Sequence, residues 1–240
     1  MKLFCIPHAG GSTLSYLPWK KHLNDHITFV PLDLPGHMPR NQEPICHDVK
    51  DAVEDLYQSL KNNLQAHEKY AIFGHSMGGM LLYFLYFRLV EDGCELPEHL
   101  FFSSRWPPYH DNPKAYFNLD NEEESKQRLI KMGGFNEVLV HNKPMLDYYM
   151  GVLLADYRLI QSTPAVRAQT IYSDMTAMWS DNEPDIADED IYSWKRSAGS
   201  RLTFVKMSGT THFFPTEEPL KTVNVINTTL QKYKESGICP

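Results

Sequence analysis

The 240-residue sequence predicts an α/β fold with a mostly parallel central sheet flanked by helices. Short apolar segments of strand character alternate with helical patterns along most of the chain. One strand runs through a glycine-rich turn directly into a helix. A single stretch, at about residues 106–160, interrupts the alternation and has no strand pattern of its own. We therefore expect one domain over residues 1–240, with a helical insertion at about 106–160 that forms a lid.

The stretch Tyr70–Gly79 is the one around which the other elements are arranged. A buried strand leads into G-x-S-x-G, with Ser76 at its centre, and Met80–Val90 continues as an apolar helix. This is the nucleophile elbow of the α/β-hydrolases, in which a β-carbon on either glycine would collide with a neighbouring element. The N–H of Met77 is then free at the helix start to bind an anion. We expect Ser76 to be the nucleophile rather than a helix-capping serine.

Before the elbow, the strand Leu3–Ile6 ends in the glycine-rich loop Pro7–Gly11. In α/β-hydrolases such a loop supplies the second donor of the oxyanion hole, which we assign to the N–H of Ala9. We expect His8 to be an ordinary loop residue without a role in proton transfer. The helical pattern Leu14–Leu23, the strand Thr28–Leu32, a Pro-Gly turn with a structural His37, and the helix Asp48–Leu64 follow in order.

After the elbow, the expected elements are the strand Glu98–Ser104, the insertion, the strands Met175–Trp179 and Arg201–Met207, and the helices Ala187–Ser197 and Thr216–Lys234. The insertion contains a charged helix start at Glu122–Lys126 and a turn at Met132–Phe135. It ends in a helix at Met145–Tyr157. The apolar side chains of that helix predict a surface that tolerates varied ligands, or else fill the insertion's own core: Met145, Leu146, Tyr149, Met150, Leu153 and Leu154.

A serine nucleophile needs a base within hydrogen-bond reach and a carboxylate that orients the base. In α/β-hydrolases the chain order is serine, acid, histidine, and the histidine follows the last strand. Of the eleven histidines, only His212 satisfies this order, so we assign it as the base. The acid should follow the penultimate strand, where Asp181, Glu183 and Asp185 lie, and the order alone does not choose among them.

Composition excludes several classes of partner. The net charge is −7 and no block of like charges occurs, so we expect no nucleic-acid partner. The four cysteines are far apart and form no C-x-x-C pair, which disfavours a metal site or disulfides and fits a reducing cytoplasm. No apolar run reaches the length of a membrane span, and the apolar stretch near the start is too short for a signal peptide. We therefore expect a cytoplasmic protein without a membrane partner.

Several motifs occur together and in a recognisable order: Pro7-His8-Ala9-Gly10-Gly11, Leu34-Pro35-Gly36-His37, Phe73–Gly79, Met132-Gly133-Gly134, Ala155-Asp156-Tyr157-Arg158, Trp194, and Gly209 with His212-Phe213-Phe214. On these motifs, which cover nearly the whole chain, the sequence resembles the type II thioesterases. These are the free-standing editing enzymes that accompany nonribosomal peptide and polyketide synthases. The resemblance implies hydrolysis of aberrant or stalled acyl thioesters on the phosphopantetheine arm of acyl or peptidyl carrier proteins. Because the substrate carries the phosphopantetheine, no metal or other cofactor is expected.

The same resemblance assigns the site residues by position. Ser76 is the nucleophile, His212 the base, and Met77 and Ala9 provide the oxyanion-hole amides. Counting from Ala155-Asp156-Tyr157 without a gap places the acid at Glu183, followed by Pro184, where the family usually has aspartate. The extra methylene of glutamate requires a shifted loop or histidine. Asp181 is the second candidate for this role and Asp185 the third.

Other functions remain open at this stage. One is a medium-chain fatty acyl thioesterase or small-ester hydrolase of the same fold, and another is an acyltransferase. A third, of a different class, is a non-catalytic protein that binds carrier proteins, although the presence of both Ser76 and His212 argues against it. We expect a monomer. The acyl group and the synthase are not specified by the sequence.

Overall fold

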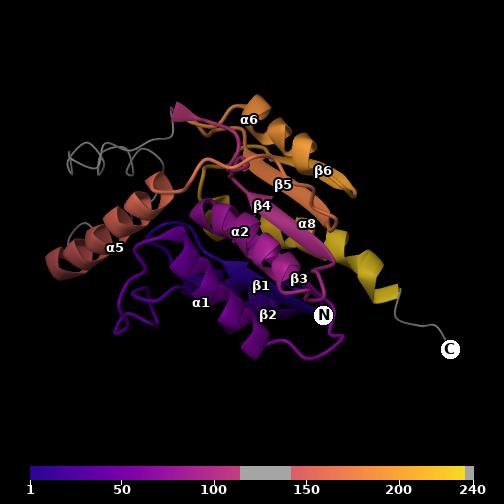
Figure 1. Ribbon diagram of the computed structural model, residues 1–240, viewed down its shortest axis with the longest axis horizontal. Helices are drawn as coiled ribbons and strands as arrows, with labels where there is room; N and C mark the ends of the chain where they lie inside the picture. The colour runs from indigo at the N-terminus through magenta and orange to yellow at the C-terminus, as the bar shows by residue number, and fades with distance from the viewer. Residues whose placement is uncertain (114–141, 236–240) are drawn as a thin grey trace.

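The computed structural model of the chain describes residues 1–113 and 142–235. Its centre is a six-stranded sheet of order β2-β1-β3-β4-β5-β6, in which all neighbouring strands are parallel (Figure 1). The strands are β1 (Lys2–Ile6), β2 (Thr28–Pro31), β3 (Tyr70–His75), β4 (His99–Ser103), β5 (Asp174–Ser180) and β6 (Leu202–Met207). The expected α/β-hydrolase fold with a parallel central sheet is thereby confirmed.

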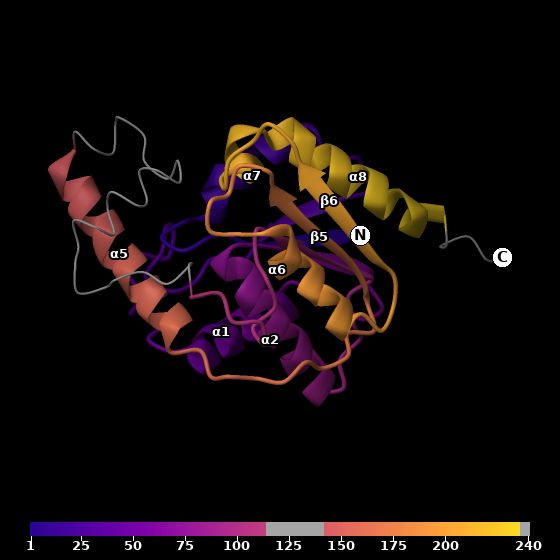
Figure 2. The same cartoon turned by 90° about the horizontal axis from the view of Figure 1, so that it is seen from above.

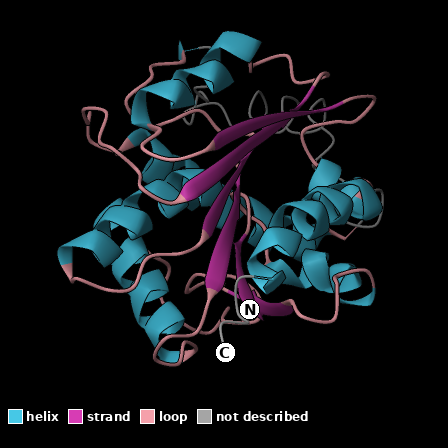
Figure 3. Ribbon diagram, turned by 90° about the vertical axis from the view of Figure 1, so that its right-hand side faces the viewer, coloured by secondary structure: helices cyan, strands magenta, loops and turns pink. Residues whose placement is uncertain are grey.

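Helices cover both faces of this sheet (Figure 3). The helices are η1 (Thr13–Lys21), α1 (Val49–Asn62), α2 (Met77–Glu91), α5 (Lys143–Gln161), α6 (Asp188–Tyr192), η3 (Ser193–Ser197), α7 (Phe214–Glu217) and α8 (Pro219–Glu235). Among the described residues, no helix is both long enough and apolar enough to cross a membrane.

The two faces of the sheet contribute to two separate cores, because successive strand residues point to opposite sides. Phe4 and Ile72 pack with α1 and α2 in one core. Leu3 and Phe73 belong to the other, which also contains Trp19 of η1 and several side chains of α8. The near-continuous apolar strands that the sequence shows are therefore explained by burial on both faces.

Three helical segments differ from the sequence expectation. The expected helix Ala187–Ser197 consists of α6 followed by the 3-10 helix η3, and proline accounts for the other two. Residues Thr13–Lys21 form a 3-10 helix that contains Pro18, which has no N–H to donate to an α-helical ladder. The closing helix is divided into α7 and α8 by Glu218, whose φ of −124° and ψ of 58° are not helical. The next residue is Pro219, and its ring disfavours helical geometry in the residue before it.

The expected insertion at residues 106–160 is only partly described. The predicted helix start at Glu122–Lys126 and the turn at Met132–Phe135 lie outside the described residues. Helix α5 is longer than expected at both ends. Figure 2 shows α5 on the side of the molecule toward which β5 and β6 point.

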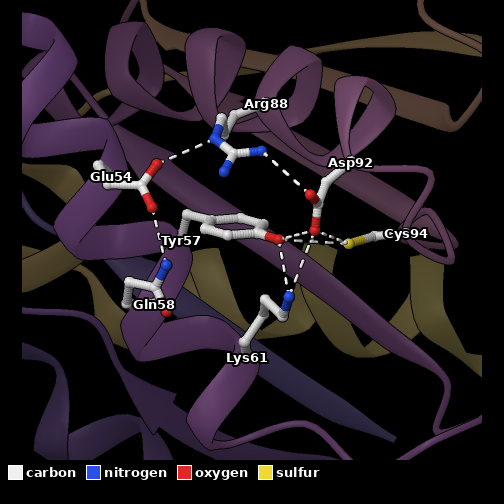
Figure 4. A network of polar contacts seen from close by, with 7 residues as sticks. All are labelled: Glu54, Tyr57, Gln58, Lys61, Arg88, Asp92 and Cys94. Atoms are coloured by element: carbon white, nitrogen blue, oxygen red, sulfur yellow. Dashed lines mark hydrogen bonds and ion pairs between the residues drawn. The ribbon is translucent and has the colours of Figure 1, made fainter.

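Helix α2, which begins at the elbow, contacts α1 through a network of polar side chains (Figure 4). Nε of Arg88 donates to Glu54 over 2.9 Å, and the guanidinium of Arg88 lies 4.1 Å from the ring centre of Tyr57. The hydroxyl of Tyr57 donates to Asp92 and accepts from Lys61. Because these contacts involve the last turn of α2, they lie roughly 20 Å from its first residue, at 1.5 Å per residue. We assign this network to the packing of the two helices.

The elbow approaches β1 so closely that only glycine fits. A β-carbon on Gly78 would lie 2.4 Å from the carbonyl oxygen of Ile6, and one on Gly74 would lie 2.3 Å from the carbonyl oxygen of Gly78. Both contacts are with backbone atoms, which cannot move without displacing a strand or a helix. The expected collision at the two flanking glycines is therefore confirmed.

We expect Gly78→Ala to destabilise the fold by about 3 kcal/mol or more, because the added methyl group overpacks a rigid backbone contact. Gly151→Ala is the matched control. A β-carbon there meets nothing within 4 Å, and Gly151 lies inside α5, so the change should stabilise by up to about 1 kcal/mol. Urea unfolding of the two variants measures both effects. Equal stability of the two variants would contradict this account of the elbow.

Candidate active site

Ser76 lies at the turn between β3 and α2 in a strained conformation. Its φ is 55° and its ψ is −115°, in a region that non-glycine residues rarely occupy. The turn is held by the N–H of Ser76, which donates to the carbonyl oxygen of Ser103 at 2.7 Å. The side chain of Ser76 makes no capping hydrogen bond to α2. The hydroxyl is therefore not engaged as a helix cap, which was the alternative interpretation of this motif.

Ser76, Glu183 and His212 line one cavity of about 430 Å³. They come from the loops that follow β3, β5 and β6, so they meet at the carboxyl edge of the parallel sheet. The Nδ1 atom of His212 lies 2.6 Å from Oε2 of Glu183, and both residues are more than nine-tenths buried. A carboxylate in this position fixes the orientation and the tautomer of the imidazole.

The second oxygen of Glu183 is held by two donors. Oε1 accepts from the hydroxyl of Ser104 and from the N–H of Ser180, each at 2.7 Å. The hydroxyl of Ser180 donates to the carbonyl oxygen of Thr210 at 2.6 Å and so ties this loop to the loop that carries His212. The loop after β5 therefore accommodates the extra methylene of glutamate with its carboxylate fully hydrogen-bonded.

The other two acid candidates are placed differently. Asp181 accepts from the N–H of Gly209 at 2.9 Å through its exposed carboxylate. Asp185 contributes to the wall of the cavity. The hydrogen bond between Glu183 and His212 thus favours Glu183 for the role of the acid.

Ser104 is a site residue that the sequence did not single out. It directly follows β4, is buried, and has a φ of 49°. Because β4 neighbours β5 in the sheet, Ser104 lies beside the loop that carries Glu183. The sequence does show a small polar residue at the carboxyl end of a strand. It does not show which strand lies beside that one, and so it could not place Ser104 next to Glu183.

The loop Pro7–Gly11 lies against the elbow, as a shared oxyanion hole requires. A β-carbon on Gly78 would contact the carbonyl oxygen of Pro7 at 2.6 Å. Within the described part of the chain, the N–H groups of Ala9 and Met77 have no hydrogen-bond partner, whereas the N–H of Gly10 donates to Asp156 at 2.6 Å. The assignment of Ala9 and Met77 to the oxyanion hole stays a prediction that this geometry permits.

Two further histidines surround His212. The ring centre of His75 lies 5.0 Å from that of His212 and 5.7 Å from that of His8. Burial, and secondarily the neighbouring His212, lowers the pKa of His8 to about 3, and the same causes hold the pKa of His75 well below its usual value. Both rings are therefore neutral at neutral pH, so neither places a positive charge beside the expected base.

The wall of the cavity differs from the expected ligand surface. It includes Trp106 and Tyr109 from the start of the insertion and Tyr157 and Ile160 from the end of α5. The earlier turns of α5 serve another purpose, since Met150 and Leu153 are buried in the core that also contains α1 and α2. Of the two alternatives for this segment, the ligand surface is wrong for Met150 and Leu153, which fill a core, although it is the main core and not one of the insertion's own. The last two turns of α5 reach the cavity instead.

His37 lies in a buried ion pair with Asp156. Its Nε2 atom lies 2.8 Å from Oδ2 of Asp156, and its Nδ1 atom lies 3.1 Å from the carbonyl oxygen of Pro35. Burial alone would lower the pKa of His37, but the hydrogen bond and charge of Asp156, with smaller contributions from Pro35 and Asp33, raise it above its ordinary value. Both ring nitrogens face acceptors, which suits the protonated imidazolium.

This raised pKa predicts a pH-dependent contribution to stability. The contribution of the pair is complete below the pKa of an unfolded histidine and is lost as the pH rises through the higher folded pKa. We therefore expect His37→Gln to destabilise the protein more at pH 6 than at pH 9. Urea unfolding of both proteins at the two pH values measures the difference. A destabilisation that is the same at both values would show that His37 is neutral in the fold.

Comparison with known proteins places the chain in a family. The family model of the thioesterase domain matches residues 1–232. The chain belongs to the thioesterase domain family. The expected resemblance to type II thioesterases is thereby confirmed at the level of family and fold.

The relatives of this thioesterase-domain protein act in several settings. Linear gramicidin dehydrogenase LgrE of Brevibacillus parabrevis is 27% identical over 234 residues, covering 96% of this chain and 88% of the relative. The medium-chain S-acyl fatty acid synthase thioesterase of Homo sapiens is 27% identical over 220 residues, covering 89% of this chain and 80% of that protein. The crystal structure of ClbQ from the colibactin NRPS/PKS pathway superposes with a TM-score of 0.89 at 27% identity, covering 98% of this chain and 99% of ClbQ.

Proposed function

We propose that this thioesterase-domain protein is a serine hydrolase that removes acyl groups from the phosphopantetheine arm of carrier proteins in nonribosomal peptide or polyketide synthesis. The contact of 2.6 Å between Glu183 and His212, on the cavity that Ser76 also lines, is the observation that carries this proposal. The similarity to ClbQ along nearly its whole length favours a carrier-bound substrate.

The first half of the proposed reaction forms an acyl-enzyme. The pantetheine arm delivers the thioester to the cavity, and Oγ of Ser76 attacks the carbonyl carbon while Nε2 of His212 accepts the hydroxyl proton. Glu183 holds the Nδ1–H of His212 and stabilises the imidazolium. The N–H groups of Met77 and Ala9 bind the oxyanion, and one such donor is typically worth about 10²–10³ in rate. His212 then protonates the departing thiolate.

The second half releases the acid. Water attacks the acyl ester on Ser76 as His212 accepts one of its protons, and the same two N–H groups hold the second oxyanion. When this intermediate collapses, His212 returns the proton to Oγ of Ser76, and the carboxylic acid departs. Atoms and charges balance over the cycle without a further reactant besides water.

The cavity supports short acyl groups of varied structure. Its volume lies in the lower part of the range for small-molecule sites, and aromatic and aliphatic side chains such as Trp106, Tyr109 and Ile160 form much of its wall. A medium-chain fatty acyl thioesterase is the second candidate, favoured by the similarity to the human enzyme of that name.

Hydrolysis rates across a panel of carrier-bound acyl groups test the proposal, with the same acyl groups on coenzyme A as the comparison. We expect short acyl groups on carriers to react fastest, whereas a preference for medium-chain acyl-coenzyme A would favour the second candidate. Analysis of the products separates hydrolysis, which yields the free acid, from acyl transfer to an amine or alcohol. A fluorophosphonate probe should label Ser76, and failure to label it would favour a non-catalytic carrier-binding protein.

A further inference from the structure

Asp156 of α5 joins three segments that are far apart in the sequence. Its Oδ2 atom accepts from the N–H of Gly10 at 2.6 Å and lies 2.8 Å from Nε2 of His37. Gly10 belongs to the loop after β1 and His37 to the loop after β2. Asp156 and His37 are 1% and 2% exposed, so both side chains are shielded from solvent.

The loop that Asp156 contacts is a tight turn, and the orientation of its peptide N–H groups matters for the proposed oxyanion hole. The N–H of Gly11 donates to the carbonyl oxygen of His8 at 2.9 Å, and Gly10 between them has a φ of 70°. A positive φ at the third residue is the mark of a type II turn. In a trans peptide the N–H points away from the carbonyl, so the bond to the His8 carbonyl also sets the direction of the Ala9 N–H.

Type I and type II turns differ by a flip of the central peptide, here the one between Ala9 and Gly10. Asp156 accepts the N–H of that peptide and so stabilises the type II turn as a whole, including the bond from Gly11 to His8 that orients the Ala9 N–H. Helix α5 packs on the same residue, since a β-carbon on Gly10 would lie 2.9 Å from Leu153 and 3.3 Å from Tyr149. The turn is therefore held both by a charged acceptor and by packing from α5.

We propose that Asp156 is a positioning residue that locks the loop Pro7–Gly11 in the turn that presents the N–H of Ala9 to the oxyanion, so that the docking of α5 completes the oxyanion hole. The proposal rests on the thioesterase function proposed above. Tyr157, the next residue of α5, lines the substrate cavity, so the helix that forms part of the acyl site also orients the donor. His37 compensates the charge of Asp156 and takes no part in the chemistry.

Three variants separate positioning from folding. The double variant Asp156→Leu/His37→Leu removes the acceptor of Gly10 and replaces both members of the buried pair by apolar groups, a change that is often neutral for stability. His37→Gln keeps the acceptor. Tyr148→Phe is the matched control on α5, because it removes the hydrogen bond of 2.9 Å from Tyr148 to the carbonyl oxygen of Gly36 without touching residues 7–11.

We expect the double variant to lose about 10²-fold in kcat with KM changed less than threefold, because an oxyanion donor acts on the transition state. His37→Gln and Tyr148→Phe should keep kcat within threefold. An acyl trifluoromethyl ketone, which forms an oxyanion on the serine, should lose affinity for the double variant about as much as kcat falls. A thioether analogue of the substrate should bind equally well.

Equal losses in kcat for the double variant and Tyr148→Phe would overturn the proposal, as would unchanged affinity for the trifluoromethyl ketone. If the double variant does not fold, the single variants Asp156→Asn and Asp156→Ala are compared in its place. The asparagine oxygen can still accept from Gly10, so only the alanine variant should lose about 10²-fold in kcat. Inactivity of the unaltered protein toward every thioester would refute the proposed function itself. That outcome is distinct from any difference in kcat between the variants and the unaltered protein.

Discussion

Replacing Ser76 with alanine is expected to lower the rate of thioester hydrolysis by roughly 10⁵–10⁶, as loss of the nucleophile does in other serine hydrolases. The elbow holds Ser76 on the same cavity as His212. Ser104 also lines the cavity with a positive φ, but its hydroxyl donates to Glu183. Thiol release from an acyl-carrier substrate measures the loss. Labelling by a fluorophosphonate should disappear with it.

The control for this prediction is Ser15→Ala. Ser15 is exposed in η1 and donates only to the carbonyl oxygen of Ser12, so its removal should leave hydrolysis unchanged. If Ser76→Ala retained more than a hundredth of the activity while remaining folded, the acyl-enzyme mechanism would have to be abandoned.

Glu183→Gln is expected to reduce kcat by about 10⁴, the loss that follows when an amide replaces the acid of a serine hydrolase. Oε1 of Glu183 accepts from Ser104 and from Ser180, so the amide oxygen of a glutamine will occupy that place. The amide nitrogen then faces Nδ1 of His212 and favours the tautomer that carries no proton there. The proton of Ser76 would be left without a correctly oriented base. Steady-state hydrolysis of a carrier-bound or coenzyme A thioester measures the change.

Asp181→Asn and Asp185→Asn are the matched controls, since they make the same chemical change on the same loop. The carboxylate of Asp181 accepts a hydrogen bond from the N–H of Gly209, so Asp181→Asn should lower kcat less than tenfold. A loss for Asp181→Asn or Asp185→Asn as large as that for Glu183→Gln would reassign the acid. Glu183→Asp is expected to fall in between, because the shorter side chain cannot reach His212 and the two donors from the same backbone position.

The sequence predicted the fold well because its strongest signals are local. A strand, a G-x-S-x-G turn and a helix follow one another within residues 70–90, and the close backbone contacts of Gly74 and Gly78 require this arrangement. The order rule of the fold also singled out His212, since only one histidine follows the last strand. Apolar strands without alternation indicated a sheet covered on both faces.

Contacts between segments that are far apart in the sequence could not be predicted from such local patterns. Ser104 supports Glu183 only because β4 and β5 are neighbours, and Asp156 reaches Gly10 across 146 positions of sequence. The apolar face of α5 was visible in the sequence, but its periodicity does not say which turn of the helix faces a cavity and which packs into the core. The choice among three acids after β5 likewise depended on the path of one short loop, which is set by the hydroxyl of Ser180.

The buried pair of Asp156 and His37 constrains how this enzyme can be redesigned. The carboxylate belongs to α5, whose last turns line the cavity, whereas its imidazole partner belongs to the loop after β2. A chimera that grafts the corresponding segment from another enzyme must bring a carboxylate to that turn of the helix. Without one, His37 would lose its proton and keep a buried ring nitrogen without its hydrogen-bond partner. That defect costs about 1–3 kcal/mol whatever acyl chain the graft was chosen to admit.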